Sequence, residues 1–282
     1  MKNKFIDLAI VTVFNPANTI VNNIKSYVNH VTELLIVDNS IKPYDFTELQ
    51  NEFSYIRIIS TNKNLGIAKA LNMGLEYASS KGYKWLLTMD QDSYFEDNEI
   101  EKFIYFFRKT STTRLAIFSP LHNKKFKKNS KKIYNSKKIA VMTSGNIISV
   151  EIALRIGGFD ENFFIDEVDH DFCLRLMGND YRIIQNYNTH LNHTLGEKHI
   201  SKNINLYSSN RLYYMLRNYL YLKHKNKHKN NLIFFKERDK YLFKFFIKQV
   251  FYGYGNKVTS LKMLYRGYKD YKKNLMGYRI VL

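Results

Sequence analysis

Short apolar runs alternate with amphipathic stretches over the first 120 residues of the chain. Runs rich in β-branched residues predict buried strands, and apolar residues three or four positions apart predict helices. The predicted strands are residues 5–14, 33–37, 55–59, 84–89 and 115–118. The predicted helices are residues 16–28, 67–80 and 98–109. Strands that alternate with helices indicate an α/β fold with a mostly parallel sheet flanked by helices.

The pattern changes further along the chain. A basic, polar stretch predicts a loop or an exposed hairpin at residues 122–138, and a helix is expected to end near Met177 before a strand at 181–184. The composition then becomes aromatic and basic, and we place a boundary near residue 200. Apolar positions at helical spacing follow in residues 205–226, 232–252 and 257–273. We therefore expect a first domain at 1–200, in halves of about 1–120 and 121–200, and a helical basic segment at 201–282.

Polar clusters stand directly after three of the predicted strands. They are Asp38-Asn39-Ser40, residues 62–66 and Asp90-Gln91-Asp92. Ligands of parallel sheets bind at the carboxyl ends of the strands. The sequence therefore predicts a ligand site at this edge of the sheet.

Asp90 and Asp92 can both reach one hard cation, because an extended turn separates them by a single residue. A bound Mg²⁺ or Mn²⁺ would stabilise negative charge on a departing diphosphate. The alternative is a solvated turn after a strand, since two aspartates at this spacing are common. His193 is a candidate third ligand, because a neutral imidazole binds Mn²⁺-type ions. His190 is its competitor.

A second acidic cluster contains Asp166, Asp169 and Asp171 beside several apolar side chains. A carboxylate at the lip of an apolar pocket is a suitable general base for a hydroxyl group. The alternative is an acidic helix N-terminus that the helix dipole favours.

The net charge of +19 is unevenly distributed. Residues 1–120 are neutral, whereas residues 201–282 contain 19 basic and only 3 acidic side chains. Basic helices with an aromatic face are typical of the interface of an anionic membrane. The same faces are compatible with packing on the first domain or with a homo-oligomer. Nucleic-acid binding is the rival explanation of the charge, but no nucleic-acid motif appears and the first 120 residues carry no excess charge.

Other features concern the compartment. Cys173 is the only cysteine, which excludes an intrachain disulfide framework and a zinc site built from cysteines. The start of the chain resembles no signal peptide, and no run of 18 apolar residues is present. We expect a cytoplasmic protein that is peripheral at the inner face of the cell membrane.

Residues 5–200 as a whole resemble the family 2 glycosyltransferases, which have the GT-A fold. The order and the spacing of the similar segments match as well as their letters. These segments are IVTVFNP, IVDNS, NKNLGIAKALNMGLEYA, WLLTMDQDSYF, TSGNIISVEIALRIGGFDENFFIDEVDHDFCLRL and HTLGEK. The long GGFDENFFIDEVDHDFCLR string is most similar to the rhamnosyltransferase branch, and SSNRLYYMLRNYLYL also resembles those enzymes.

The resemblance implies a donor half at about 1–120 and an acceptor half at about 121–200. Residues implied to bind the nucleotide sugar are Thr12, Phe14, Asn15, Asp38, Asn64, Gly66, Lys69 and Asp90. Implied metal ligands are Asp92, Asp90 and His193. Gly145 and Asn146 would shape the acceptor side. Asp169 aligns with the catalytic aspartate, although Val168 stands where the family usually has Glu, and Asp166 and Asp171 are the fallback bases.

The implied reaction is a single inverting displacement that needs a divalent cation. The implied donor is dTDP-L-rhamnose, and the implied acceptor is a glycan or an undecaprenyl-linked sugar in bacterial surface-glycan synthesis. Alternative donors are UDP-galactofuranose, UDP-glucose and UDP-N-acetylglucosamine. A nucleotidyltransferase could also use two aspartates on such a sheet, but it would release pyrophosphate rather than a nucleoside diphosphate.

Overall fold

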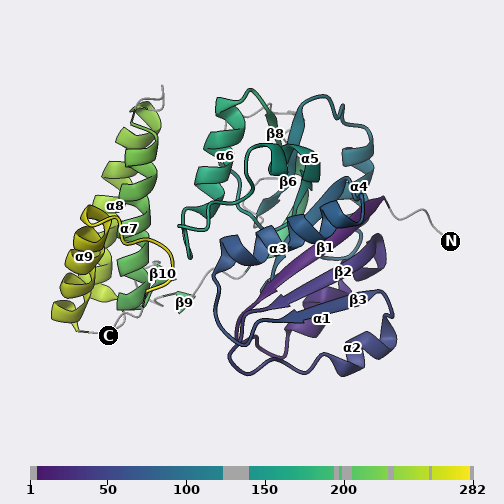
Figure 1. The fold of residues 1–282 in the computed structure, drawn as a ribbon, viewed down its shortest axis with the longest axis horizontal. Coiled ribbons are helices and arrows are strands. Elements are labelled where there is room, and N and C mark those ends of the chain that lie inside the picture. The colour runs from purple at the N-terminus through teal and green to yellow at the C-terminus, as the bar shows by residue number, and fades with distance from the viewer. Residues whose placement is uncertain are drawn as a thin grey trace. The chain divides into compact units, whose positions relative to one another are not determined.

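The computed structural model describes residues 5–122, 140–193, 197–198, 205–227, 232–253 and 256–279 (Figure 1). The chain divides into two compact units. The first unit contains residues 1–160 and 169–194, and the second contains residues 161–168 and 195–282. The basic stretch predicted at 122–138 lies, apart from His122, outside the described residues, and so does the boundary predicted near residue 200.

The first unit is built on an eight-stranded sheet with the order β3-β2-β1-β4-β7-β6-β8-β5. The strands are β1 (Ile6–Val13), β2 (Val31–Asp38), β3 (Ile56–Ser60), β4 (Trp85–Asp90), β5 (Ser93–Tyr94), β6 (Leu115–His122), β7 (Asn146–Ser149) and β8 (Arg182–His193). Neighbours among β1 to β4 are parallel, whereas β7 runs antiparallel to both β4 and β6. The parallel half is therefore joined to a mixed half.

The register of the parallel half aligns the polar ends of its strands. Thr12 of β1 pairs with Asp90 of β4, and Val13 pairs with Asp38 of β2. Asp38 in turn pairs with Ser60 at the end of β3. The polar clusters that follow these strands consequently meet at one edge of the sheet.

Helices cover both faces of this sheet. They are α1 (Ile20–Lys25), the 3-10 helix η1 (Val28–His30), α2 (Thr47–Glu52), α3 (Ile67–Ser80), α4 (Glu99–Arg108), α5 (Val150–Arg155) and α6 (Val168–Gly178). Figure 1 shows α3 crossing the strands on the side of the viewer. Gly74 of α3 lies against Ile10 of β1, where a larger side chain would collide. On the opposite face, α1 and α4 bury their apolar side chains in one core cluster with β1, β2 and β4.

The structure confirms the α/β class and the mostly parallel first half, and it corrects several element bounds. The first helix begins at Ile20 rather than at Pro16 and ends at Lys25, and the 3-10 helix η1 follows it. The strand expected at 181–184 extends to His193. The sequence pattern missed α2 and β5, which are too short to show a period.

The second unit contains three long helices, as expected from residue 205 onward. They are α7 (Ser209–Lys225), α8 (Leu232–Tyr252) and α9 (Lys257–Lys272), and a short strand pair, β9 (Glu197–Lys198) and β10 (Asn205–Leu206), precedes them. α9 packs closely on α7, because a Cβ at Gly267 would lie 2.6 Å from the carbonyl oxygen of Tyr213. In the described part of the chain, no helix combines the length and the apolar character needed to cross a bilayer.

Arg217 is the central polar residue of the second unit, and its side chain is fully buried. Its guanidinium donates to the carbonyl oxygens of Leu275 and Gly277, and to side chains on its own helix. It also lies over the rings of Tyr213 and Tyr214. Arg217 therefore ties the end of the chain to α7.

We expect Arg217→Leu to lower the free energy of unfolding by about 3 kcal/mol, because the buried hydrogen-bond network of Arg217 is removed and two partly buried carbonyl groups lose their donor. Urea unfolding followed by circular dichroism measures the change. Arg211→Leu on the same helix removes a half-exposed arginine paired with Asp166 and should cost less than about 1 kcal/mol. Equal losses in the two variants would contradict this account.

Candidate active site

Asp90, Asp92 and His193 meet at the carboxyl end of β4. β5 pairs with β8 so that Ser93 stands opposite His193, which brings the imidazole to the turn after β4. Nε2 of His193 lies 3.5 Å from Oδ2 of Asp90 and 3.1 Å from Oδ1 of Asp92. One ligand atom from each residue lies within 4.8 Å of the others. The structure thus brings together the three residues that the sequence suggested as metal ligands.

The chemistry of these three groups fits a divalent cation. Two carboxylate oxygens and an imidazole nitrogen are donors that suit Mn²⁺, and oxygen donors also suit Mg²⁺. Three protein ligands leave coordination positions for oxygens of a phosphate or of water. The competitor His190 lies outside the group, and its backbone N–H donates to Glu99 instead.

Residues of α1 and of the segment after it hold the turn that follows β4. Asn23 donates its side-chain amide to the carbonyl oxygen of Gln91, at 2.8 Å, and Ser26 accepts from the N–H of Phe95. Tyr27 is buried beside the turn. Its burial, with a smaller contribution from the negative charge of Asp90, raises the pKa of the Tyr27 hydroxyl. These contacts therefore fix the backbone of the turn that carries Asp90 and Asp92.

The loop after β2 is shaped by the carboxylate of Asp38, which is fully buried. Its two oxygens accept from the backbone N–H groups of Ser40 and Tyr44. Ser40 then accepts from the N–H of Asn15 in the loop after β1, at 2.7 Å. The carboxylate of Asp38 thus holds the shape of its own loop, and its part in binding the nucleotide sugar stays a prediction.

The loop before α3 is likewise held in shape by side-chain hydrogen bonds to its backbone. Asn64 accepts from the N–H of Gly66, and Gly66 has φ 86° and ψ 168°, a conformation open essentially to glycine alone. Asn39 donates to the carbonyl oxygen of Gly66. Lys69 follows in the first turn of α3. Asn64, Gly66 and Lys69 therefore stand at the same sheet edge as the other predicted donor residues.

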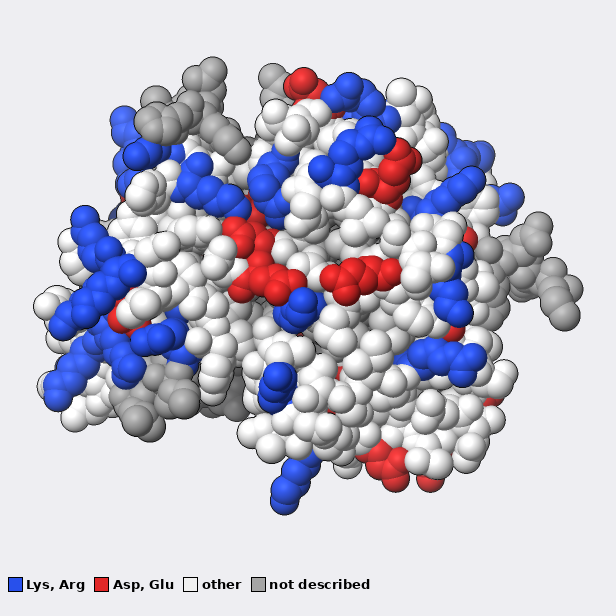
Figure 2. Space-filling view, viewed as in Figure 1, with Lys and Arg blue, Asp and Glu red and all other residues white. Residues whose placement is uncertain are grey.

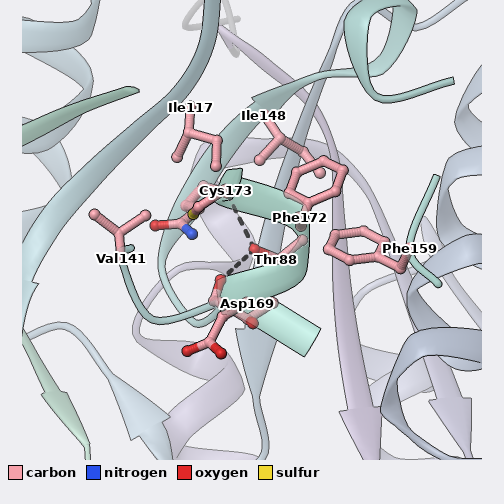
Figure 3. A pocket seen from close by; sticks show the side chains of 10 residues that line it. Thr88, Ile117, Val141, Ile148, Phe159, Asp169, Phe172 and Cys173 are labelled. Atoms are coloured by element: carbon pink, nitrogen blue, oxygen red, sulfur yellow. Dashed lines mark hydrogen bonds between the residues drawn. The ribbon is translucent and has the colours of Figure 1, made fainter. Parts of the chain in front are cut away.

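Asp169 lies in the first turn of α6 and lines a small cavity (Figure 3). The other lining residues are Thr88, Ile117, Val141, Thr143, Asn146, Ile148, Phe159, Phe172 and Cys173. Figure 3 shows the carboxylate of Asp169 pointing away from the apolar side chains. Oδ1 of Asp169 lies 2.9 Å from Nδ1 of His170. Thr88 precedes Asp90 by two residues on β4, so the cavity places Asp169 beside the strand that ends at the candidate metal ligands.

The other two aspartates of the acidic cluster are engaged differently. Asp171 is 1% exposed and accepts from Nε of Arg175 at 2.7 Å. Arg175 also donates to the carbonyl oxygens of Ile156 and Gly158. Asp166 belongs to the second unit, where it pairs with Arg211. Asp169 is the member of the cluster that lines the cavity.

Gly145 and Asn146 fill structural positions beside this cavity. Gly145 has φ 79°, and a Cβ there would lie 2.7 Å from Leu191 and 2.9 Å from Pro120. Asn146 donates its side-chain amide to the carbonyl oxygen of Met142. Its Oδ1 is buried and makes no hydrogen bond within the described part of the chain.

Residues 8–186 match the family described as Glycosyl transferase family 2. The chain belongs to glycosyltransferase family 2. This glycosyltransferase is 27% identical to the dTDP-rhamnosyl transferase RfbF of Shigella flexneri over 243 residues, which cover 77% of this chain and 80% of the relative.

Solved structures support the fold of this glycosyltransferase. The crystal structure of S. aureus TarS residues 1–349 in complex with UDP-GlcNAc matches with a TM-score of 0.53 and 14% identity, covering 92% of this chain and 70% of that one. A second crystal structure of S. aureus TarS matches with a TM-score of 0.52 and 13% identity, covering 95% of this chain and 44% of that one. At such low identity the likeness concerns the fold alone, and it agrees with the GT-A type expected from the sequence.

Several positioning side chains of the glycosyltransferase were missed from sequence. Asn72 of α3 both donates to the carbonyl oxygen of Phe159 and accepts from its N–H, at 2.9 and 2.8 Å. Ser144 accepts from the N–H of Asp90. The sequence marks Asn72 only as a polar residue on an otherwise apolar face of its helix. It carries no comparable mark for Ser144.

Cys173 is not a nucleophile in this site. Burial raises the pKa of its thiol to about 12, and the charges of Asp169 and Asp171 act in the same direction. Because the thiolate is the reactive form, the side chain is inert near neutral pH. Cys173 packs as a small apolar residue behind Asp169.

We expect Asp171→Asn to destabilise the glycosyltransferase by about 2 kcal/mol, because Arg175 loses its buried counter-ion. Asp169→Asn should change the free energy of unfolding by less than about 0.5 kcal/mol, since the side chain of Asp169 is partly exposed and an amide oxygen can still accept from the backbone N–H of His170. Denaturant titrations of both variants compare the two values. A larger loss for Asp169→Asn would reverse the roles given to these aspartates.

Proposed function

We propose that this enzyme transfers L-rhamnose from dTDP-L-rhamnose to a glycan or an undecaprenyl-linked acceptor, with inversion at the anomeric carbon. The observation that carries the proposal is the meeting of Asp90, Asp92 and His193 at the end of β4, on the strand that also borders the cavity of Asp169. The donor is supported by the dTDP-rhamnosyl transferase relative. UDP-galactofuranose, UDP-glucose and UDP-N-acetylglucosamine remain the alternative donors, and the structural likeness to a protein in complex with UDP-GlcNAc is compatible with them.

Asp90, Asp92 and His193 would hold a divalent cation, Mn²⁺ or Mg²⁺. When bound, the cation would offset the negative charge of the leaving nucleoside diphosphate. The loop after β1 presents Phe14 and Asn15, and the loop after β3 presents Asn64, at the same edge of the sheet. Phe14 has a side chain that is 42% exposed, which leaves its ring available to contact a nucleotide.

Asp169 is proposed as the general base. Its carboxylate would take the proton of the acceptor hydroxyl while that oxygen bonds to the anomeric carbon, and the bond from that carbon to the diphosphate breaks with both electrons leaving on the diphosphate. His170 lies within hydrogen-bonding distance of Oδ1 of Asp169 and restricts its orientation. Asp171 is a poorer candidate, since its carboxylate is buried and pairs with Arg175, so that an acceptor hydroxyl cannot reach it.

The second unit is proposed to contact an anionic membrane through α8. Phe243, Ile247 and Phe251 are exposed and recur every four residues, so they share one face of the helix. Lys240, Lys244 and Lys248 have the same spacing beside them. Figure 2 shows many Lys and Arg side chains, separated by uncharged ones, over the C-terminal helices. An exposed apolar stripe flanked by lysines is typical of a helix that lies in a membrane interface.

We expect Asp169→Asn to lower kcat by about a thousandfold or more, because the amide cannot accept the proton, while binding of the donor nucleotide is retained. The assay measures release of dTDP from dTDP-L-rhamnose in the presence of Mn²⁺ and a membrane extract as the acceptor source. The UDP sugars named above are tested in parallel. Full activity of Asp169→Asn would refute the base assignment, and release of UDP with no release of dTDP would replace the donor.

We expect replacement of Phe243, Ile247 and Phe251 by Ser to weaken binding to vesicles of phosphatidylglycerol and phosphatidylcholine at least tenfold, because apolar area is lost from the interface. Cosedimentation measures the bound fraction. The matched control replaces Ile41 and Leu154, two exposed apolar residues of the first unit, by Ser and should bind like the wild type. Equal binding by both variants would exclude α8 as the contact.

A further inference from the structure

Gln91, the residue between Asp90 and Asp92, holds the backbone of Phe14 by two hydrogen bonds. Its Oε1 accepts from the N–H of Phe14 at 2.7 Å, and its Nε2 donates to the carbonyl oxygen of Phe14 at 3.2 Å. One side chain thus satisfies both backbone groups of a residue 77 positions away in the chain. The contact joins the cation-binding turn after β4 to the donor loop after β1.

Both ends of this link are fixed by other contacts. The carbonyl oxygen of Gln91 itself accepts from Asn23, and the N–H of the neighbouring Asp90 donates to Ser144. On the other side, the residue after Phe14 is Asn15, whose N–H donates to Ser40. Asn23 and Ser144 hold only the turn after β4, and Ser40 holds only the loop after β1. The two hydrogen bonds of Gln91, by contrast, join one loop to the other.

The side-chain amide of Gln91 binds the backbone of Phe14, whereas its two neighbours, Asp90 and Asp92, belong to the group of candidate metal ligands. A solvated turn would need no particular residue here. A side-chain amide is suited to the position, because it presents a donor and an acceptor together and matches the two groups of a backbone peptide. A carboxylate offers only acceptors, and a hydrocarbon offers neither.

We infer that Gln91 is a positioning residue that couples cation binding at Asp90 and Asp92 to nucleotide binding at the Phe14 loop. This inference rests on the proposed function, in which the cation and the nucleotide diphosphate share the site. With the link intact, a cation that orders the turn also orders the Phe14 loop, so that each ligand improves the binding of the other. Coupling of two ligands through one protein contact is reciprocal.

The test is a set of calorimetric titrations of the full chain with dTDP and with UDP, each with and without saturating Mn²⁺. In the wild type, Mn²⁺ should tighten binding of the preferred nucleotide. Gln91→Met keeps the length of the side chain but removes both hydrogen bonds, and it should reduce this tightening at least about fivefold. Gln50→Met, the same change at an exposed position of α2, should keep the wild-type value.

Thermal unfolding separates positioning from a general structural role. Gln91→Met should unfold within about 2 °C of the wild type, because the turn keeps its contacts with Asn23 and Ser144. A large drop in unfolding temperature, or an unchanged effect of Mn²⁺ in Gln91→Met, would overturn the inference.

Asp92→Ala distinguishes a failure of this inference from a failure of the proposed function. If the effect of Mn²⁺ is lost in Asp92→Ala but kept in Gln91→Met, the metal site stands and the role of Gln91 is refuted. If Mn²⁺ has no effect on either nucleotide in the wild type, the assignment of the metal site fails, and the inference on Gln91 fails with it.

Discussion

The structure depends on hydrogen bonds between side chains and backbone at the carboxyl edge of β1 to β4. Parallel strands end side by side, and the loops that follow them expose backbone groups that no strand partner satisfies. Here Asn39, Ser40 and Gln91 supply those partners from neighbouring loops, and Asp38 supplies them within its own loop. The site is therefore not a set of independent loops placed on a scaffold. Each loop is held in shape by the one beside it, and the turn of Asp90 and Asp92 belongs to the same network of contacts.

A similar arrangement holds the opposite side of the cavity. Asn72 binds both backbone groups of Phe159, and Arg175 binds two carbonyl oxygens in the same turn while pairing with Asp171. α6 begins beside this turn and carries Asp169. In both places an amide side chain takes the part that a strand partner would otherwise take. Irregular backbone is thus kept rigid near groups whose chemistry requires accurate placement.

Much of the fold could be predicted from the sequence, because strands and helices leave periodic patterns that do not depend on distant contacts. Helix α3 has the predicted bounds, and each end of the strands β1 to β4 lies one or two residues from its predicted position. The meeting of Asp90 with His193 was suggested by residue chemistry and by the family resemblance. The paired hydrogen bonds of Gln91 with Phe14 and of Asn72 with Phe159 were not predicted, because no local sequence pattern marks a partner so distant in the chain. The buried roles of Asp38 and Asp171 likewise depend on where distant backbone groups lie.

The pairing of β5 with β8 has a consequence for how the enzyme matures. Asp90 and Asp92 come from the first half of the sheet. His193 is the last residue of β8, which is the last strand of this sheet along the chain. A growing polypeptide on the ribosome consequently displays two carboxylates long before their imidazole partner has been made. The group of Asp90, Asp92 and His193 is therefore complete only when the last strand of the first unit has docked.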